Sequence, residues 1–171
     1  YKNRKAIILF ADMDGLKQIN DNYGHAAGDI AICACADILK KAAGEHGIAG
    51  RLGGDEFALM MIGDETRAIE LVETVRKEIA MYNAQGKNKF VIDMSVGCQI
   101  VLCTDELSIP MVLEKADKIM YEEKKIMFYL ALVYSSPGHS FTCCRFYRCP
   151  GSICQQYFHR MENLRWKKIL L

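Results

Sequence analysis

A short glycine-rich turn between two strand-like segments is the feature that most limits the fold of this chain. Residues 48–52 and 56–62 are short and largely apolar, and only Gly53-Gly54-Asp55 separates them. Two strands joined by so short a loop must run antiparallel, because a parallel pair needs a crossover of a dozen or more residues. The sequence therefore predicts a β-hairpin with an acidic residue at its tip.

The other predicted elements surround this hairpin. Apolar or β-rich runs predict strands at residues 6–11 and 90–102. The predicted helices lie at residues 16–22, 28–43, 66–83 and 108 to about 125. In the second helix the predicted apolar stripe consists of Ile30, Ile32, Cys33, Ala36 and Leu39. This order predicts an α+β fold, an antiparallel central sheet flanked by helices, and it resembles the ferredoxin-like arrangement enlarged in nucleotide cyclases and polymerase palms.

The length and charge of the chain argue against general binding to nucleic acid or membranes. Its 171 residues suffice for about one domain, and 22 Lys and Arg against 21 Asp and Glu give a net charge of +1. This balance provides no general attraction to nucleic acid or membranes, so any phosphate binding needs a local site. The apolar run at residues 126–134 has about half the length of a membrane span.

The last part of the chain departs from this pattern. From about Met127 it is rich in Cys, aromatic residues and Arg and shows no clear period. We therefore expect a domain at residues 1–126 and a tail at residues 127–171 that is a small addition, disordered, or not native to the domain. The chain begins with Tyr1 rather than Met, which predicts a fragment of a longer protein, truncated at its N-terminal end.

Acidic residues lie at the ends of two predicted strands. Asp12 follows the strand at residues 6–11, and Asp55 and Glu56 lie at the hairpin tip. If the first strand pairs beside the hairpin, Asp12 and Asp55 converge at one edge of the sheet. Converging carboxylates repel each other and need a cation, and hard oxygen ligands favour Mg²⁺. The alternative interpretation is two surface turns rich in Asp and Gly.

The segment after Asp12 has features of a nucleotide site. The strand-to-helix turn at residues 14–17 can present backbone N–H groups to phosphate, and Lys17 adds a positive charge. Asn20 and Asp29 can bind a purine edge, where a carboxylate accepts from the N1–H and N2–H₂ groups of guanine and disfavours adenine. The simpler interpretation is a solvated lysine and two helix caps.

Four segments together match one family signature. Residues 12–29 have the sequence DMDGLKQINDNYGHAAGD, and residues 51–57 have the sequence RLGGDEF. Residues 116–124 (ADKIMYEEK) and 95–97 (SVG) follow in the expected order. From about residue 6 to 125 the chain thereby resembles the GGDEF family of diguanylate cyclases, whose signature is D-x-D-x-x-K-x-x-N-D-x-x-G-H-x-x-G-D followed by the naming motif.

The resemblance implies an activity, a cofactor and roles for single residues. The activity is the condensation of two GTP molecules into cyclic di-GMP and pyrophosphate, in bacterial second-messenger signalling, with Mg²⁺ or Mn²⁺. The implied metal ligands are Asp12, the Met13 carbonyl and Asp55. The implied catalytic residues are Asp55, Lys17 and Glu56. The implied substrate-binding residues are Asn20, Asp29, Gly53, Gly54 and Lys124.

The resemblance also implies partners. Each domain would hold one GTP, so catalysis would need a homodimer, and an upstream sensory or regulatory domain in the parent protein would bring the two domains together. No nucleic-acid partner is expected. The nucleotide substrate implies a cytoplasmic location, whether or not the parent protein is anchored in a membrane.

The chain departs from the family pattern in three ways. The inhibitory R-x-x-D site that many members carry is Gly44-Glu45-His46-Gly47 here, so we expect no product inhibition through it. Phe128 replaces the Arg that often follows the matched lysine, Lys124, by four residues, and the usual D-x-L-T-G-L-x-N-R segment does not precede the domain. Two alternatives stay open: an inactive GTP-binding or scaffold module, and a cyclase that uses ATP or mixed substrates.

Overall fold

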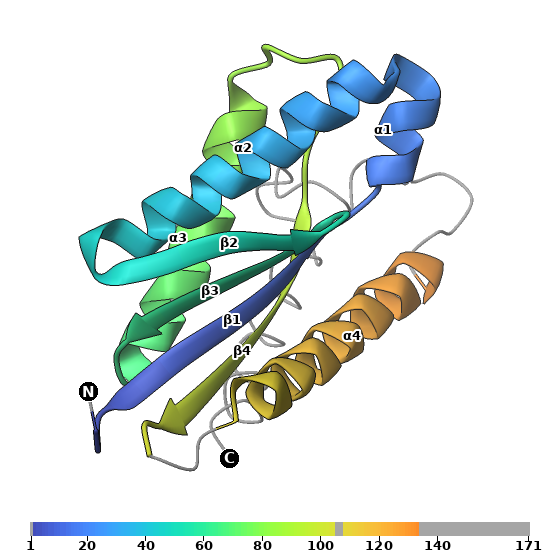
Figure 1. Cartoon of the computed structure of the whole chain (residues 1–171). Helices are drawn as coiled ribbons and strands as arrows, with labels where there is room; N and C mark the ends of the chain where they lie inside the picture. The colour runs from blue at the N-terminus through green and yellow to red at the C-terminus, as the bar shows by residue number, and fades with distance from the viewer. Residues whose placement is uncertain (1, 105–107, 134–171) are drawn as a thin grey trace, which may run out of the picture. The chain divides into compact units, whose positions relative to one another are not determined.

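The computed structural model describes residues 2–104 and 108–133, which form a four-stranded antiparallel sheet with helices around it (Figure 1). The strand order is β2-β3-β1-β4. The strands are β1 (Lys5–Met13), β2 (Gly47–Gly53), β3 (Glu56–Ile62) and β4 (Met94–Leu102). The helices are α1 (Leu16–Tyr23), α2 (His25–Ala43), α3 (Glu65–Ala84) and α4 (Ile109–Val133), with a short 3₁₀ helix at Gly44–His46. The predicted α+β fold and the β2–β3 hairpin are confirmed.

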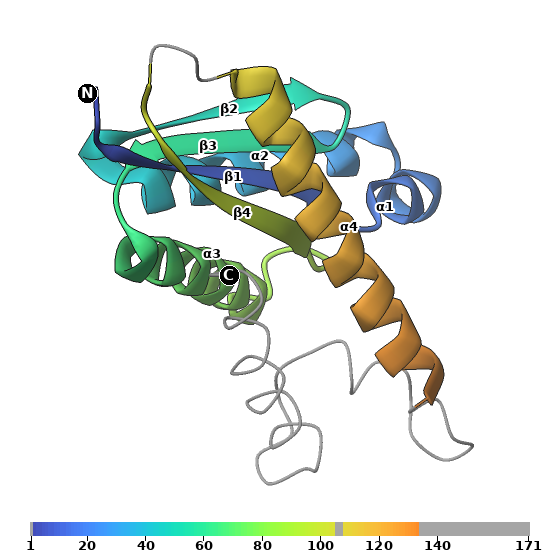
Figure 2. The same cartoon turned by 90° about the horizontal axis from the view of Figure 1, so that it is seen from below.

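Strand β1 is the centre of the sheet. Its residues 6–11 are all buried, as expected for a strand with a partner on each side and helices over both faces. Figure 2 shows α2 and α3 on one face of the sheet and the first part of α4 on the other. On that second face Phe10 packs with Ala116 and Met120. The central strand therefore ends, at Met13, in a fixed position between β3 and β4.

Helix α4 lies very close to β4 at Gly97. A Cβ atom built at Gly97 would lie 2.6 Å from the Met120 backbone nitrogen and would collide with the Ala116 carbonyl oxygen. Only glycine permits this approach, which explains the glycine in the segment Ser95-Val96-Gly97.

The chain divides into two compact units, Tyr1–Tyr121 and Glu122–Leu171. Helix α4 begins in the first unit and ends in the second. The contacts described below belong to the first unit. Among the described residues no helix is both long and apolar enough to cross a bilayer.

Three predicted boundaries differ from the structure, and the first is the start of α2, which lies at His25 rather than at residue 28. Strand β4 begins at Met94 rather than at residue 90, because the Asn83 side chain accepts from the Ile92 N–H and donates to the Ile92 carbonyl, at 3.0 and 2.8 Å. These bonds hold the backbone of Ile92 in the loop, so its N–H and carbonyl groups do not pair with a neighbouring strand. Helix α4 continues to Val133 rather than ending near residue 125, because no glycine or proline interrupts it there.

The predicted apolar stripe of α2 is largely wrong. Ile30 is 50% exposed and Cys33 is exposed, whereas Leu39 is buried as predicted. The buried face consists of small residues and two large ones, namely Gly28, Ala31, Ala34, Cys35, Ile38, Leu39, Ala42 and Ala43. Small side chains on this face let α2 approach its neighbours closely, so the larger Ile30 lies on the outside.

Candidate active site

The hairpin tip is held in one conformation by Arg51. Its Nε and Nη2 atoms donate to the Gly54 carbonyl oxygen at 2.9 and 2.6 Å. Gly54 has a φ of 51°, a left-handed conformation that favours glycine. The β2–β3 pairing shifts between Arg51 and Gly53, next to the turn. Asp55 is half-buried in this turn, and Glu56 is exposed at the start of β3.

The end of β1 lies beside the tip. Asp12 pairs with Glu56 in the β1–β3 register, and the Met13 N–H donates to the Asp55 carbonyl oxygen at 2.9 Å. The N–H and C=O groups of an extended residue point to the same side of its strand, so the Met13 carbonyl is also directed toward the tip. The two acidic segments noted in the sequence are therefore neighbours.

The turn after β1 leaves the start of α1 open. Gly15 precedes the helix with a φ of 75° and has no side chain to accept from the first N–H groups. Lys17 lies exposed in the first helical turn. Uncapped N–H groups, the positive end of the helix dipole and a lysine together favour an anion such as phosphate.

Asn20 on α1 and Asp29 on α2 belong to helices that pack together at Gly28. A Cβ atom built at Gly28 would lie 2.9 Å from Asn20 Cγ and would collide with Asn20 Oδ1. The helix caps are Gly15 and Gly24, so neither Asn20 nor Asp29 occupies a capping position. The simpler interpretation of these two side chains as caps is therefore wrong.

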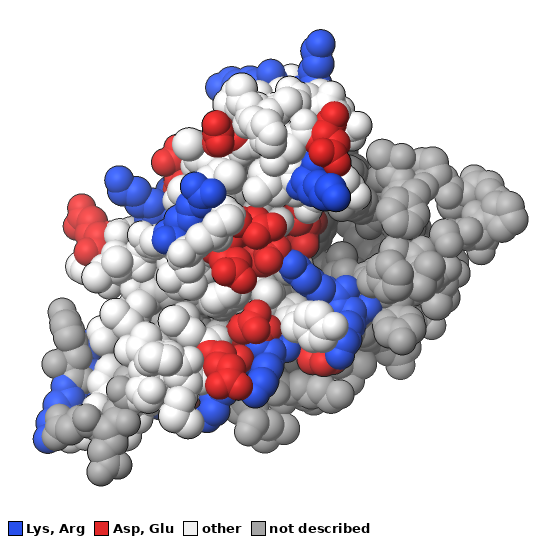
Figure 3. Space-filling model, turned by 45° about the vertical axis from the view of Figure 1, so that its right-hand side comes forward, with Lys and Arg blue, Asp and Glu red and all other residues white. Residues whose placement is uncertain are grey.

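Acidic side chains gather on the side of the molecule toward which the hairpin tip and α1 point. Figure 3 shows Asp and Glu side chains together on this side, with Lys and Arg side chains around them. Such an arrangement favours a cation at the carboxylates and anionic groups at their border.

A buried thiol lies close to the turn. Burial, and after it the charges of Asp93 and Asp14, raise the pKa of Cys35 to about 12. The thiol is therefore neutral at physiological pH and behaves as a small core residue rather than as a nucleophile.

Comparison with known proteins decides the family. Residues 1–128 match the family described as "GGDEF: Diguanylate cyclase, GGDEF domain". The chain belongs to the GGDEF family. Its GGDEF domain is 35% identical over 129 residues to diguanylate cyclase A of Treponema denticola, covering 72% of this chain and 34% of that protein.

The chain is also similar to a second curated protein and to a solved structure. An uncharacterized 19.3 kDa protein of Streptomyces ambofaciens is 34% identical over 128 residues, covering 72% of this chain and 66% of that protein. The crystal structure of the GGDEF domain of DgcB from Caulobacter crescentus, in complex with c-di-GMP, has a TM-score of 0.62 at 25% identity, covering 71% of this chain and 73% of that chain. The chain thus spans less than two thirds of the length of the curated relatives named here.

The oxygen atoms around the tip of the GGDEF domain suit a divalent cation. Asp12, Asp55 and the Met13 carbonyl offer hard oxygen donors, which Mg²⁺ and Mn²⁺ prefer. In the described part of the chain no three His, Cys, Asp or Glu side chains form a ready metal cluster. Mg²⁺ is commonly held by one or two carboxylates together with substrate phosphates and water.

The remaining predicted residues are placed as follows. Gly53 ends β2 and Gly54 lies in the turn, and a Cβ atom built at either would meet nothing within 4 Å. The backbone of the tip is thus open to an approaching ligand. Lys124 lies on α4 in the second unit, so its role at the phosphates stays a prediction. Phe128 belongs to the same helix, and the four tail cysteines (Cys143, Cys144, Cys149 and Cys154) lie outside the described residues.

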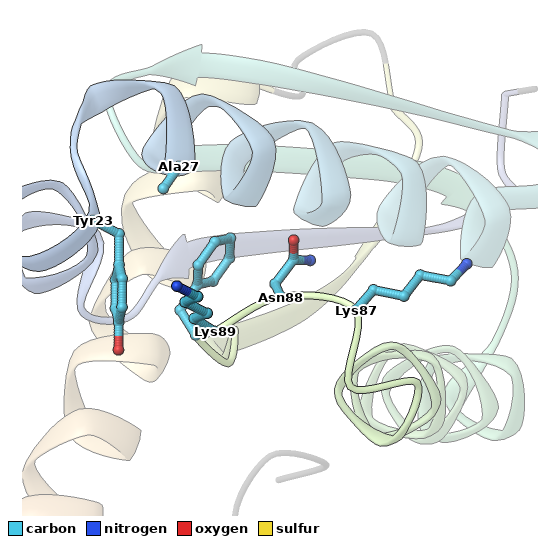
Figure 4. A pocket seen from close by; sticks show the side chains of 6 residues that line it. Tyr23, Ala27, Lys87, Asn88 and Lys89 are labelled. Carbon is cyan, nitrogen blue, oxygen red and sulfur yellow. The ribbon is translucent and has the colours of Figure 1, made fainter.

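One surface pocket of about 440 Å³ lies apart from the predicted site residues. Tyr23, Ala27 and the loop residues 87–90 line it (Figure 4). The Tyr23 and Phe90 rings contact each other at a centroid distance of 6.0 Å. No predicted metal, catalytic or substrate residue lines this pocket.

Two features of the site were not predicted from the sequence. Arg51 fixes the hairpin tip, and Ser95 of β4 donates from Oγ to Asp14 Oδ2 at 2.8 Å. The Ser95–Asp14 bond depends on the register between β1 and β4, and the Arg51 bonds depend on the conformation of the hairpin turn, and residue spacing alone provides neither.

Proposed function

We propose that this GGDEF domain is a diguanylate cyclase that condenses two GTP molecules into cyclic di-GMP and pyrophosphate. One observation carries the proposal. Asp12 and Met13, at the end of β1, lie beside Asp55 and Glu56 at the hairpin tip, next to the uncapped start of α1. The relation to diguanylate cyclase A of Treponema denticola supports it.

The proposed binding mode assigns the guanine, the phosphates and the approach to the hairpin to different residues. Asn20 and Asp29 would bind the guanine edge, and the Asp29 carboxylate would favour guanine over adenine. The first N–H groups of α1 and Lys17 would bind the phosphates, with Lys124 as a further contact. Gly53 and Gly54 would let the nucleotide approach the hairpin backbone.

The proposed reaction forms one phosphodiester bond in each of two steps. The 3′-hydroxyl oxygen of one GTP attacks the α-phosphorus of the other, the bond from this phosphorus to the β-phosphate oxygen breaks, and pyrophosphate leaves. Asp55 would help to remove the hydroxyl proton, Glu56 would act beside it, and Lys17 would stabilise the developing charge. A divalent cation held by Asp12, Asp55 and the Met13 carbonyl would lower the pKa of the hydroxyl and neutralise phosphate charge. Because each domain holds one GTP, two domains must face each other.

The test compares the intact chain with Asp55→Asn, and with Asp37→Asn as a matched control on the exposed side of α2. Each protein is incubated with GTP and Mg²⁺, and the nucleotides are separated by chromatography. We expect cyclic di-GMP from the intact chain and from Asp37→Asn, and a loss of at least about 100-fold in Asp55→Asn. GTP binding without product in the intact chain would instead favour a GTP-binding or scaffold module, and equal turnover of ATP would favour the mixed-substrate alternative.

A further inference from the structure

Ser95 is the only polar or charged residue that is buried within the described part of the chain, with 6% of its surface exposed. A buried hydroxyl needs a hydrogen-bond partner, and that of Ser95 is the carboxylate of Asp14, whose Oδ2 accepts from Oγ at 2.8 Å. Hydrogen bonds to an ionised acceptor are stronger than neutral ones. The bond joins the start of the edge strand β4 to the turn between β1 and α1.

Ser95 lies opposite one carboxylate residue, Asp12, and bonds to another, Asp14. Ser95 lies directly opposite Asp12 in the β1–β4 register. Asp14 lies two residues beyond Asp12, in the turn that follows β1. The hydrogen bond holds the Asp14 carboxylate on the β4 side of β1, whereas the hairpin tip lies on the β3 side. Asp14 is thus bonded on the side of β1 that faces away from the hairpin tip.

The backbone of the same turn is held from both sides. The Asp14 N–H donates to the Asp93 carbonyl oxygen at 2.9 Å, and the Met13 N–H donates to the Asp55 carbonyl oxygen at 2.9 Å. Arg76 of α3 supports the start of β4, because its Nη1 donates to the Met94 carbonyl oxygen at 2.6 Å and lies 3.6 Å from Asp93 Oδ1. On the β4 side the turn is therefore held at Asp14, through its N–H bond to Asp93 and its carboxylate bond to Ser95.

We propose that Ser95 is a positioning residue of the nucleotide site, acting through the carboxylate of Asp14. The Ser95–Asp14 bond fixes the turn that presents the Asp12 carboxylate, the Met13 carbonyl and the first N–H groups of α1. Without the hydroxyl, the turn loses this bond, and the Asp12 carboxylate and the Met13 carbonyl are held less firmly in their present orientation. This inference rests on the proposed function, because it assigns Ser95 to the metal-dependent binding of GTP at that site.

The test is a double-mutant cycle with Ser95→Ala, Asp14→Ala and the double variant in the full chain. Calorimetry measures the affinity for a non-hydrolysable GTP analogue with and without Mg²⁺. Removal of a group that orients a metal ligand commonly lowers metal affinity by 10- to 100-fold, so we expect about a tenfold loss in Ser95→Ala with Mg²⁺ and little change without it. The losses in the two single variants should not add in the double variant. Thr74→Val removes a hydroxyl that donates to the Glu70 carbonyl within α3 and should not change the affinity.

A second readout separates positioning from general destabilisation. Thermal melting identifies any variant that fails to fold, and Ser95→Thr, which keeps the hydroxyl, should restore most of the Mg²⁺-dependent affinity. The proposal is overturned if folded Ser95→Ala binds the Mg²⁺ complex as the intact chain does, or if the two losses add. An intact chain that shows this Mg²⁺ dependence but makes no cyclic di-GMP would disprove the proposed function and leave the role of Ser95 standing. An intact chain without metal-dependent binding would disprove both.

Discussion

At the scale of single residues, Gly28 decides where the amide of Asn20 lies. Gly28→Ala adds a methyl group that collides with Asn20 Oδ1, although alanine is the better helix former by about 1 kcal/mol. We expect the variant to bind the Mg²⁺ complex of a GTP analogue about tenfold more weakly, because the loss of one good polar contact to the guanine has about that effect. Calorimetry measures the affinity, and denaturant unfolding measures the stability.

The control for this change is Gly50→Ala on β2, where an added Cβ atom meets nothing within 4 Å. Its affinity should equal that of the intact chain. Combining Gly28→Ala with Asn20→Ala should add little to the loss caused by Asn20→Ala alone. Unchanged affinity in Gly28→Ala would show that the Asn20 amide does not bind the guanine from its present position.

The sequence indicates which acidic segments lie together better than it indicates the contacts around them. Asp12 and Asp55 could be brought together from the sequence, because a hairpin beside the first strand leaves few other arrangements. The Ser95–Asp14 bond could not, since it depends on the register between β1 and β4, which lie far apart in the chain. The positioning contacts of the site thus require the structure.

At the scale of elements, the packing of α4 on β4 depends on Gly97. In Gly97→Ala the new methyl group would meet the Ala116 carbonyl oxygen and the Met120 nitrogen, which are backbone atoms and cannot rotate away. We expect the free energy of unfolding to fall by about 2–3 kcal/mol, the upper range for an overpacked core. Urea unfolding measures this change, and Gly50→Ala should change it by less than about 0.5 kcal/mol. Equal stability of the two variants would show that α4 tolerates a shift away from β4.

Helix α2 shows why a hydrophobic pattern can predict an element and still misplace its buried face. The predicted stripe followed helical spacing and included Ile30, which is half-exposed, and Cys33, which is exposed. The buried face instead contains Ala31, Ala34 and Cys35, whose small side chains carry a weak hydrophobic signal but permit close packing. The spacing of apolar residues predicts that a helix forms, whereas the face that it buries depends on the space that the neighbouring elements leave.

At the scale of the whole molecule, one domain offers only half of the proposed reaction. In the proposed function the carboxylates, the uncapped start of α1, Asn20 and Asp29 belong to one nucleotide site, where β1 ends beside the hairpin tip. The reaction needs two bound GTP molecules in opposed orientation, so activity should depend on encounters between domains. We expect the rate per molecule to rise nearly in proportion to protein concentration while dimers are scarce.

A mixing experiment tests the same dependence at a fixed amount of intact chain. Excess Asp55→Asn variant added to a fixed amount of intact chain should capture intact domains in mixed dimers that lack one Asp55 carboxylate. Product formation should therefore fall as the variant is added, whereas an equal excess of Asp37→Asn, which keeps the site, should raise it. Chromatography of the nucleotides measures both series. A rate per molecule that stays constant over a 100-fold range of concentration, together with no inhibition by the Asp55→Asn variant, would show that a single domain completes the reaction.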